Sequence, residues 1–108
     1  MLKGLGNLAN IMKQAQQMQK RLAELQEELE REQVTATAGG GMVTVTMNGK
    51  QKIVGIKIDK EVVNPEEISL LEDLILVAMN EAQDRVQEMV KSRMTSMTGD
   101  LSIPGLTP

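Results

Sequence analysis

The sequence predicts an α+β fold of the order α-β-β-β-α, in which two long helices flank a three-stranded antiparallel sheet. Three features predict it: apolar residues at helical spacing near the start, three short runs that alternate apolar and polar residues, and a capped, strongly apolar segment after residue 64. The 108 residues have the length of one domain. We expect that domain to span residues 1–95, followed by a flexible tail over residues 96–108.

The first helix is predicted between about residues 7 and 32, where apolar side chains recur at alternating intervals of three and four. The residues between them are mostly Lys, Gln, Arg, Ala and Glu, which favour a helix. This heptad seam indicates packing on the protein's own sheet or, as in a coiled coil, on another helix. Binding to a membrane surface is the weaker alternative, because aromatic anchors are missing. The seam consists of Leu8, Ile11, Ala15, Met18, Leu22, Leu25 and Leu29.

Three strands are predicted from the period-two alternation in the runs 34–38, 43–47 and 54–58. Between the second and third runs, Asn48-Gly49 is a strong hairpin signal, because both central residues of a type I′ turn need a positive φ. We therefore expect a sheet with one apolar face, whose second and third strands are joined by a type I′ turn.

Gly39, Gly40 and Gly41 raise the question whether the chain binds a nucleotide. A phosphate-binding loop places its glycines between a strand and the N-terminus of a helix, and it ends in Lys-Ser or Lys-Thr. Here the three glycines run into a strand, and Gly49-Lys50 is followed by glutamine. The pattern favours a tight connection or a bulge between paired strands over a phosphate site.

The second helix is predicted from about residue 65 to residue 95. Asn64 and Pro65 are typical of a helix start, and two glutamates follow in the first turn. From residue 70 to residue 79 the segment is apolar on most sides, and one sheet covers only one of them. We expect a second copy of the chain to cover the rest, which gives an intimate homodimer. The predicted dimer interface consists of Leu70, Leu71, Leu74, Ile75, Val77 and Ala78.

The composition removes most of the groups on which catalysis and metal binding rely. The chain contains no His, Cys, Phe, Tyr or Trp, and nine Met residues help to fill the core. Neighbouring carboxylates in a helix point in different directions, and Asp59 with Glu61 lacks the ligand count of a calcium loop. We expect no enzyme activity, no metal-binding residues and no small-molecule substrate. The sequence shows neither a signal peptide nor a membrane segment, so we expect a cytoplasmic protein.

The net charge of −3 hides a strong segregation of charge along the chain. Residues 1–23 carry four basic side chains and no acid, whereas residues 24–32 carry five glutamates and one arginine. Residues 33–58 carry three lysines and no acid, and residues 59–84 carry eight acids and one lysine. Local electric fields can therefore be positive although the whole chain is negative.

Three stretches of the chain carry a resemblance: MKQAQQMQKRLAELQEELE, TATAGGGMVTVTMNGKQKIVGIKID and LEDLILVAMNEAQDRVQEMV. The most specific part is the block Gly-x-Gly-x-Val-x-Val-x-x-Asn-Gly-Lys that begins at Gly39. Over about residues 8–94, the chain resembles the YbaB/EbfC family of bacterial nucleoid-associated proteins. The resemblance implies a tweezers-shaped homodimer that binds duplex DNA in the nucleoid, affects gene expression, and has neither enzyme activity nor a cofactor.

In that family, basic positions on the two terminal helices are implicated in DNA contact, and the charge map agrees. If the two helices run antiparallel, a basic tip forms where the first begins and the second ends, with the acidic segments 24–32 and 59–73 toward the other end. The candidate DNA-binding residues are Lys13, Lys20, Arg21, Lys91 and Arg93. For Lys50, Lys52 and Lys57 of the hairpin, protection of an exposed sheet edge is favoured over DNA contact.

Two other classes of function remain open at this point. A helix, a hairpin and a helix in a chain of this size also suit a chaperone-like or scaffold protein, although three strands and an evenly apolar second helix argue against free arms. The third interpretation is a partner protein of a cytoplasmic complex, for which DNA contact is secondary. A mobility-shift titration on duplex DNA across a salt series discriminates among them.

Overall fold

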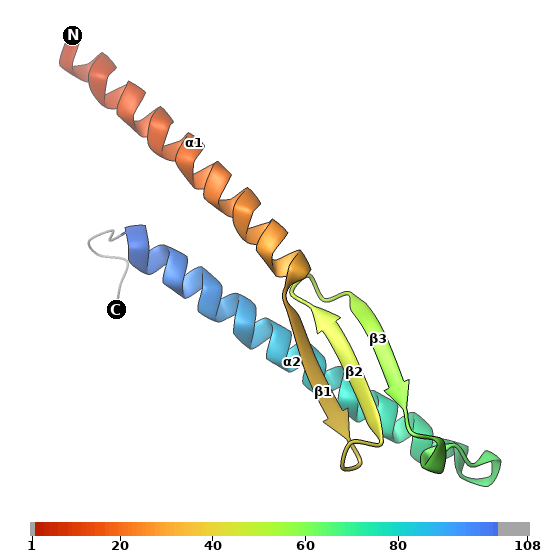
Figure 1. Ribbon diagram of the computed structural model, residues 1–108. Helices are drawn as coiled ribbons and strands as arrows, with labels where there is room; N and C mark the ends of the chain where they lie inside the picture. Colours follow the sequence, from red (N-terminus) through yellow and green to blue (C-terminus); the bar gives the residue numbers. More distant parts are fainter. Residues whose placement is uncertain (1, 102–108) are drawn as a thin grey trace.

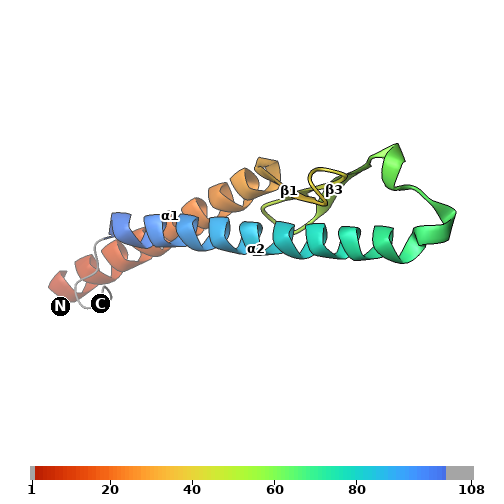
Figure 2. The same ribbon diagram turned by 90° about the horizontal axis from the view of Figure 1, so that it is seen from below.

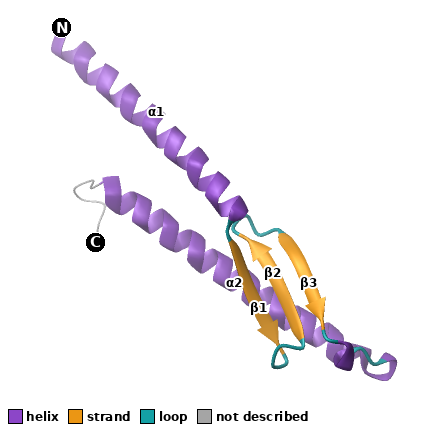
Figure 3. Ribbon diagram, viewed as in Figure 1, coloured by secondary structure: helices purple, strands orange, loops and turns teal. Residues whose placement is uncertain are grey.

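The computed structural model describes the backbone of residues 2–101 and the side chains of residues 6–97. Two helices and three strands follow one another in the predicted order (Figure 1; Figure 3). The elements are helix α1 (Leu2–Arg31), strands β1 (Gln33–Ala38), β2 (Val43–Asn48) and β3 (Ile53–Ile58), the short 3-10 turns η1 (Lys60–Val62) and η2 (Pro65–Glu67), and helix α2 (Ile68–Leu101). The α+β class and the element order are therefore confirmed.

The helix boundaries differ from the predicted ones. Helix α1 begins at Leu2, ahead of the predicted start. The Asn64 side chain accepts a hydrogen bond from the Glu66 amide at 3.0 Å, and it caps the turn η2 that precedes α2. Helix α2 then continues to Leu101, so the first part of the predicted tail is helical. The rest of that tail, residues 102–108, lies outside the described residues.

The core lies between α2 and one face of the sheet, and Figure 2 shows α2 as a separate layer beside the strands. The strands are ordered β1-β2-β3 with both pairs antiparallel, and α2 packs on β1 and β2. Val43, Val45 and Met47 alternate along β2 and are almost fully buried. The fully buried residues that α2 adds to this core are Ala78, Ala82 and Val86. The predicted apolar face of the sheet is thereby confirmed.

Strand β3 lies beyond the edge of α2. Val45 pairs with Ile56 and Val43 with Ile58, so these isoleucines lie on the same face of the sheet as the core. Because α2 packs mainly on β1 and β2, Ile56 and Ile58 remain 49% and 37% exposed. The sheet therefore carries more apolar surface than one chain covers.

Helix α1 does not lie along the sheet. It meets the strands at its last turns and then extends away from them, so the molecule measures 79 Å in length against 27 and 16 Å in the other directions (Figure 1). Leu8 and Ile11 of the heptad seam are more than half exposed. Of the two packing surfaces predicted for the seam, the protein's own sheet is thus used only at the buried Leu29, and only α2 flanks the sheet along its length.

The loop of Gly39, Gly40 and Gly41 joins β1 to β2, and no helix begins there. All three residues have positive φ angles, of 63°, 68° and 97°, which other residues seldom adopt. A Cβ atom at Gly39 would also lie 2.9 Å from the Leu74 side chain. The predicted tight connection is confirmed, and it lacks the helix N-terminus that a phosphate-binding loop uses.

The hairpin between β2 and β3 is confirmed, but the predicted type I′ turn is wrong. Neither Asn48 nor Gly49 has a positive φ, whereas Gln51 has one of 63°. The Gln51 amide donates to the Asn48 carbonyl at 3.0 Å, and the Asn48 amide donates to the Lys52 carbonyl at 2.9 Å. These bonds define a three-residue loop, in which a tight turn is followed by one left-handed residue.

Gly49 is needed for another reason, because the end of α1 lies directly against it. Its amide donates to the Leu29 carbonyl at 2.7 Å and to the Glu32 carbonyl at 3.1 Å. The turn thus satisfies carbonyl groups that a helix end leaves unpaired. A Cβ atom at position 49 would lie 2.5 Å from the Leu29 carbonyl oxygen, so the close approach requires glycine.

We expect Gly49→Ala to destabilise the fold, because the backbone of α1 leaves no room for a methyl group. The expected loss in the free energy of unfolding is about 1–3 kcal/mol, which lowers the Tm by roughly 5–15 °C in a domain of this size. Gly55→Ala in β3 is the matched control, since a Cβ atom there meets nothing within 4 Å. Thermal unfolding at one protein concentration compares the two variants. Equal melting temperatures would show that the base of α1 moves aside at little cost.

Candidate nucleic-acid interface

The projecting part of α1 carries three of the five predicted DNA-binding residues. Lys13, Lys20 and Arg21 are exposed, and none of them has an ion-pair partner in the described part of the chain. Lys13 and Lys20 are seven positions apart, so they lie on nearly the same face of the helix, about 10 Å apart along its axis. Arg21 is rotated from Lys20 by about 100°. The helix therefore presents a basic strip to the solvent, which consists of Lys13 and Lys20 on one face with Arg21 beside them.

The two predicted residues of α2 point to different sides. Lys91 and Arg93 are both exposed, but two positions along a helix correspond to a rotation of about 200°. The Arg93 guanidinium forms ion pairs with two carboxylates. One is Glu28 of α1, at 3.7 Å, and the other is Glu32, which directly follows α1. Lys91 has no ion-pair partner among the described residues. Only Lys91 thus resembles the basic residues of α1 in its surroundings.

The expected basic tip is present only in part. The start of α1 and the end of α2 do lie at the same end of the molecule (Figure 1). However, α1 extends further than α2, so Arg93 lies beside Glu28 and Glu32 and not beside Lys13. The acidic segment 59–73 lies at the other end of the molecule, as predicted (Figure 1), whereas the acidic segment 24–32 lies between the basic part of α1 and the sheet.

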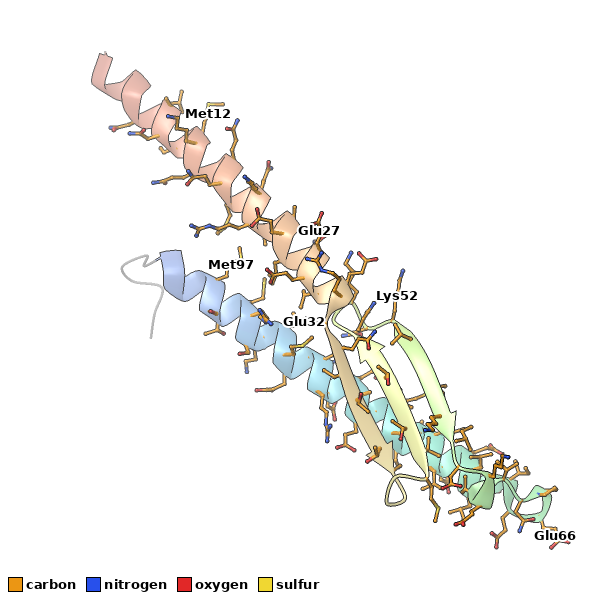
Figure 4. All side chains as sticks on the ribbon, viewed as in Figure 1. Met12, Glu27, Glu32, Lys52, Glu66 and Met97 are labelled. Atoms are coloured by element: carbon orange, nitrogen blue, oxygen red, sulfur yellow. The ribbon has the colours of Figure 1, made fainter. Side chains whose placement is uncertain are left out.

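An open hollow lies between the two helices at this level. Arg21 and Glu28 of α1 and Arg93 of α2 contribute to its lining. In Figure 4, Met97 of α2 points toward α1, and Glu32 lies where α1 meets the strands. Because both acidic and basic side chains line the hollow, its field is mixed and does not single out an anion.

The hairpin lysines differ among themselves. Lys50 lies 3.6 Å from Glu30 of α1, so it contributes to the contact between the turn and the helix end. Lys52 and Lys57 are exposed without ion-pair partners in the described residues. Figure 4 shows Lys52 at the hairpin end of the sheet, close to the base of α1. Lys57 lies in the edge strand β3 and Lys52 directly precedes it, so their charges are consistent with the predicted protection of a sheet edge.

The residues predicted for a dimer interface fall into three groups. Ala78 is fully buried in the protomer's own core and has no surface left for a partner. Leu70 and Val77 are 47% and 55% exposed and remain available. Half-buried against the protein's own core are Leu71, Leu74 and Ile75. Sequence reasoning missed that Ile56 and Ile58 stay exposed, because the alternation in their strand was assigned to the core of a single chain.

The carboxylates of the described residues do not gather into a metal-binding cluster. No three Asp or Glu side chains among them lie close enough together to hold a metal ion. The Asp59 carboxylate accepts a hydrogen bond from the Glu61 amide at 3.2 Å and so caps the turn η1. In residues 2–101, neither helix is long and apolar enough to cross a membrane.

The fold and the exposed basic strip define an elongated α+β protein with one projecting helix that suits a polyanion. The sequence model of the YbaB/EbfC DNA-binding family matches residues 4–101. This chain belongs to that family.

Relatives that are named nucleoid-associated proteins match nearly the whole chain. A nucleoid-associated protein of Moorella thermoacetica is 52% identical over 102 residues, which is 94% of this chain and 98% of that protein. A nucleoid-associated protein of Clostridium kluyveri is 50% identical over 103 residues, 95% of this chain and 90% of that protein. The crystal structure of an uncharacterized protein from Helicobacter pylori matches with a TM-score of 0.74 at 26% identity, covering 82% of this chain and 92% of that one.

Proposed function

We propose that this protein binds duplex DNA as a homodimer, mainly by phosphate contacts, and acts as a nucleoid-associated protein without enzyme activity. The observation that carries the proposal is the projecting helix α1, on which Lys13, Lys20 and Arg21 face solvent with no acidic partner among the described residues. Lys91 of α2 adds a fourth basic group at the same end of the molecule. The family's DNA-binding character and the names of the relatives support the same conclusion.

Phosphate contacts are favoured over recognition of bases. The sequence contains no aromatic side chain, so the bases of a single strand have no platform on which to stack. Three of the four basic residues lie along the projecting helix α1, and none lies on the second helix of a helix–turn–helix pair. Their contacts therefore go mainly to phosphates, which carry little sequence information. We infer a preference for duplex DNA with weak dependence on its sequence.

The uncovered apolar surface supports a homodimer. Strand β3 leaves Ile56 and Ile58 exposed on the core face of the sheet, and α2 leaves Leu70 and Val77 exposed. Burial of such surface stabilises by about 25 cal/mol per Å², and apolar surface left in water promotes association in any case. A second copy related by a two-fold axis offers the same surface in return. Such a homodimer carries two basic α1 helices, which doubles the number of groups that engage DNA.

The same chemistry determines where the protein acts. A binder of phosphates with little sequence preference distributes over chromosomal DNA, which places it in the cytoplasmic nucleoid. By occupying long stretches of duplex, it influences nucleoid organisation and gene expression. Phosphate contacts by lysine and arginine need no cofactor and no catalytic residue.

A scaffold or chaperone-like role is the second candidate, and the exposed seam of α1 favours it. Leu8 and Ile11 are 55% and 60% exposed, and an apolar helix side in water suits another protein chain. In that case the partner is a protein of a cytoplasmic complex, and DNA contact is secondary or absent.

A salt titration of duplex binding tests the two candidates. For a dimer that neutralises roughly four to eight phosphates, we expect the logarithm of the binding constant to fall with log salt at a slope of about −4 to −7. Fluorescence anisotropy with two unrelated duplexes of equal length measures the slope and the sequence dependence together. If the protein ignores both duplexes at about 50 mM salt, where electrostatic binding is strong, the scaffold role replaces the DNA-binding one.

A further inference from the structure

The base of α1 is held on one side by the hairpin turn. The Gly49 amide binds the carbonyls of Leu29 and Glu32, and Lys50 of the same turn pairs with Glu30 at 3.6 Å. Leu29 is the one residue of the described part of α1 that is buried. These contacts attach the helix end to the sheet at one place and act as a pivot.

A second contact with the base of α1 comes from α2, where Arg93 pairs with Glu32, a residue 61 positions earlier in the chain. The Arg93 guanidinium forms ion pairs with Glu28 and Glu32, which lie one helical turn apart on the same side of α1. Toward the start of α1, nearly all described side chains are exposed; only Met18 and Leu25 are half-buried. Arg93 therefore makes the main polar contact between α2 and the end of α1 in the described part of the chain.

We propose that Arg93 is a positioning residue, which clamps α1 to α2 and fixes the direction in which α1 carries its basic strip. A helix attached only at its pivot is free to swing. A second contact, from a different element and on the opposite side of the helix end, restricts that freedom, because Glu28 and Glu32 are each about 200° of rotation away from Glu30, which the hairpin holds. The clamp stands on the contacts of the single chain, and only its consequence for DNA affinity rests on the proposed function.

The length of α1 gives a weak clamp a large effect. Lys13 lies 19 positions from Glu32, which is about 28 Å along a helix. A swing of 10° at the base therefore displaces Lys13 by about 5 Å, enough to lose a phosphate contact. Exposed ion pairs change the ratio of two conformations only roughly two- to fivefold, but few other contacts of α1 oppose the swing.

A direct contact of Arg93 with DNA is the competing role, and it has different consequences. A side chain that neutralises a phosphate contributes about one unit to the salt slope of binding. A clamp contributes none, because its charge stays paired with Glu28 and Glu32 when DNA binds. The two roles also differ without DNA, since only a clamp changes the direction of the free helix.

Distances within the DNA-free protein test the clamp directly. The sequence contains no cysteine, so cysteines placed at the exposed Gln16 of α1 and Gln83 of α2 accept spin labels at these two sites only. Labelled chains are diluted with unlabelled protein, so that double electron–electron resonance measures only the distance between the two labels of one chain. The variants are Arg93→Gln, the exchange E32R/R93E, which keeps the net charge, and Arg85→Gln. Arg85 binds the Thr35 carbonyl and Glu81 on the same helix, so its loss removes equal charge without touching α1.

We expect one narrow distance distribution for the unsubstituted protein and for Arg85→Gln. Arg93→Gln should broaden it, with a roughly two- to fivefold gain in displaced orientations, and E32R/R93E should restore much of the narrow population. Thermal unfolding identifies any variant that fails to fold. A distribution unchanged by Arg93→Gln, or already broad in the unsubstituted protein, overturns the clamp.

DNA titrations of the same variants separate the clamp from the function. Arg93→Gln should weaken duplex binding roughly two- to fivefold with an unchanged salt slope, and E32R/R93E should recover the affinity. A slope reduced by about two units in the Arg93→Gln dimer, one for each chain, overturns the clamp in favour of direct contact. If neither the variants nor the unsubstituted protein bind duplex DNA, the proposed function is wrong. The distances measured without DNA still test whether Arg93 acts as a clamp.

Discussion

Lys13→Glu combined with Lys20→Glu is expected to lower the affinity for duplex DNA by more than about 100-fold at about 100 mM salt. The two lysines lie on nearly the same face of α1 and are exposed without ion-pair partners among the described residues. In a dimer, the double reversal removes four phosphate contacts and replaces them by repulsion. Because neither side chain contributes to the core, the Tm and the oligomeric state should stay unchanged.

Arg21 is left intact in this variant. It lines the hollow that Glu28 and Arg93 also line, so a carboxylate at position 21 competes for the Arg93 guanidinium. Reversal there would change the direction of α1 and the charge of α1 together. The Lys13 and Lys20 pair isolates charge from geometry, which makes the loss of affinity attributable to phosphate contacts.

The matched control reverses Lys52 and Lys57 of the hairpin. The charge change is the same, and both lysines are exposed without ion-pair partners in residues 6–97, whereas Lys50 pairs with Glu30. We expect a loss of affinity of less than about tenfold from the general change in field. If the hairpin reversal proves the more damaging, the DNA-binding surface lies on the sheet, and the projecting helix is not the contact.

Much of the fold was predictable because the signals for helices and strands are local. The heptad seam, the alternation in β2 and the Asn64 cap depend on neighbours within a few positions, and each one gave the correct element. Family resemblance added the DNA-binding class. The direction of α1 carries no such signal, since a seam such as that of Leu8 and Ile11 has the same spacing whether its partner is a sheet, a helix or solvent.

The candidate site was less predictable because it depends on contacts between distant segments. Arg93 and Lys91 have the same charge and lie two positions apart, yet only Arg93 meets acidic partners on α1. The need for glycine at position 49 is likewise decided by Leu29, twenty residues earlier, which leaves no room for a side chain. The exposure of β3 follows from the width of α2 relative to the sheet, which local spacing does not report.

Ile56→Glu is expected to convert the proposed homodimer into a folded monomer. Ile56 lies on the core face of the sheet and is 49% exposed in the single chain, so a glutamate is tolerated there in water. In an interface, the same glutamate is a buried unpaired charge, and we expect a loss of at least about 3 kcal/mol, or more than 100-fold in dimer affinity. Val77→Glu on α2 should act in the same direction. Sedimentation equilibrium over about 1–100 μM measures the change.

Leu74→Glu does not serve this purpose, because Leu74 packs against the protomer's own core and against Gly39, so its loss unfolds the chain as well. Thr37→Glu is the matched control: it adds the same charge to β1 on the opposite face of the sheet, where Thr37 pairs with Thr44. We expect Thr37→Glu to remain dimeric.

If the dimer survives both Ile56→Glu and Val77→Glu, the interface lies elsewhere on the chain. If the unsubstituted protein is a folded monomer at 100 μM, the proposal of a homodimer is wrong. In that case a single chain supplies all basic groups, and the salt slope of duplex binding falls to about half of that expected for a dimer.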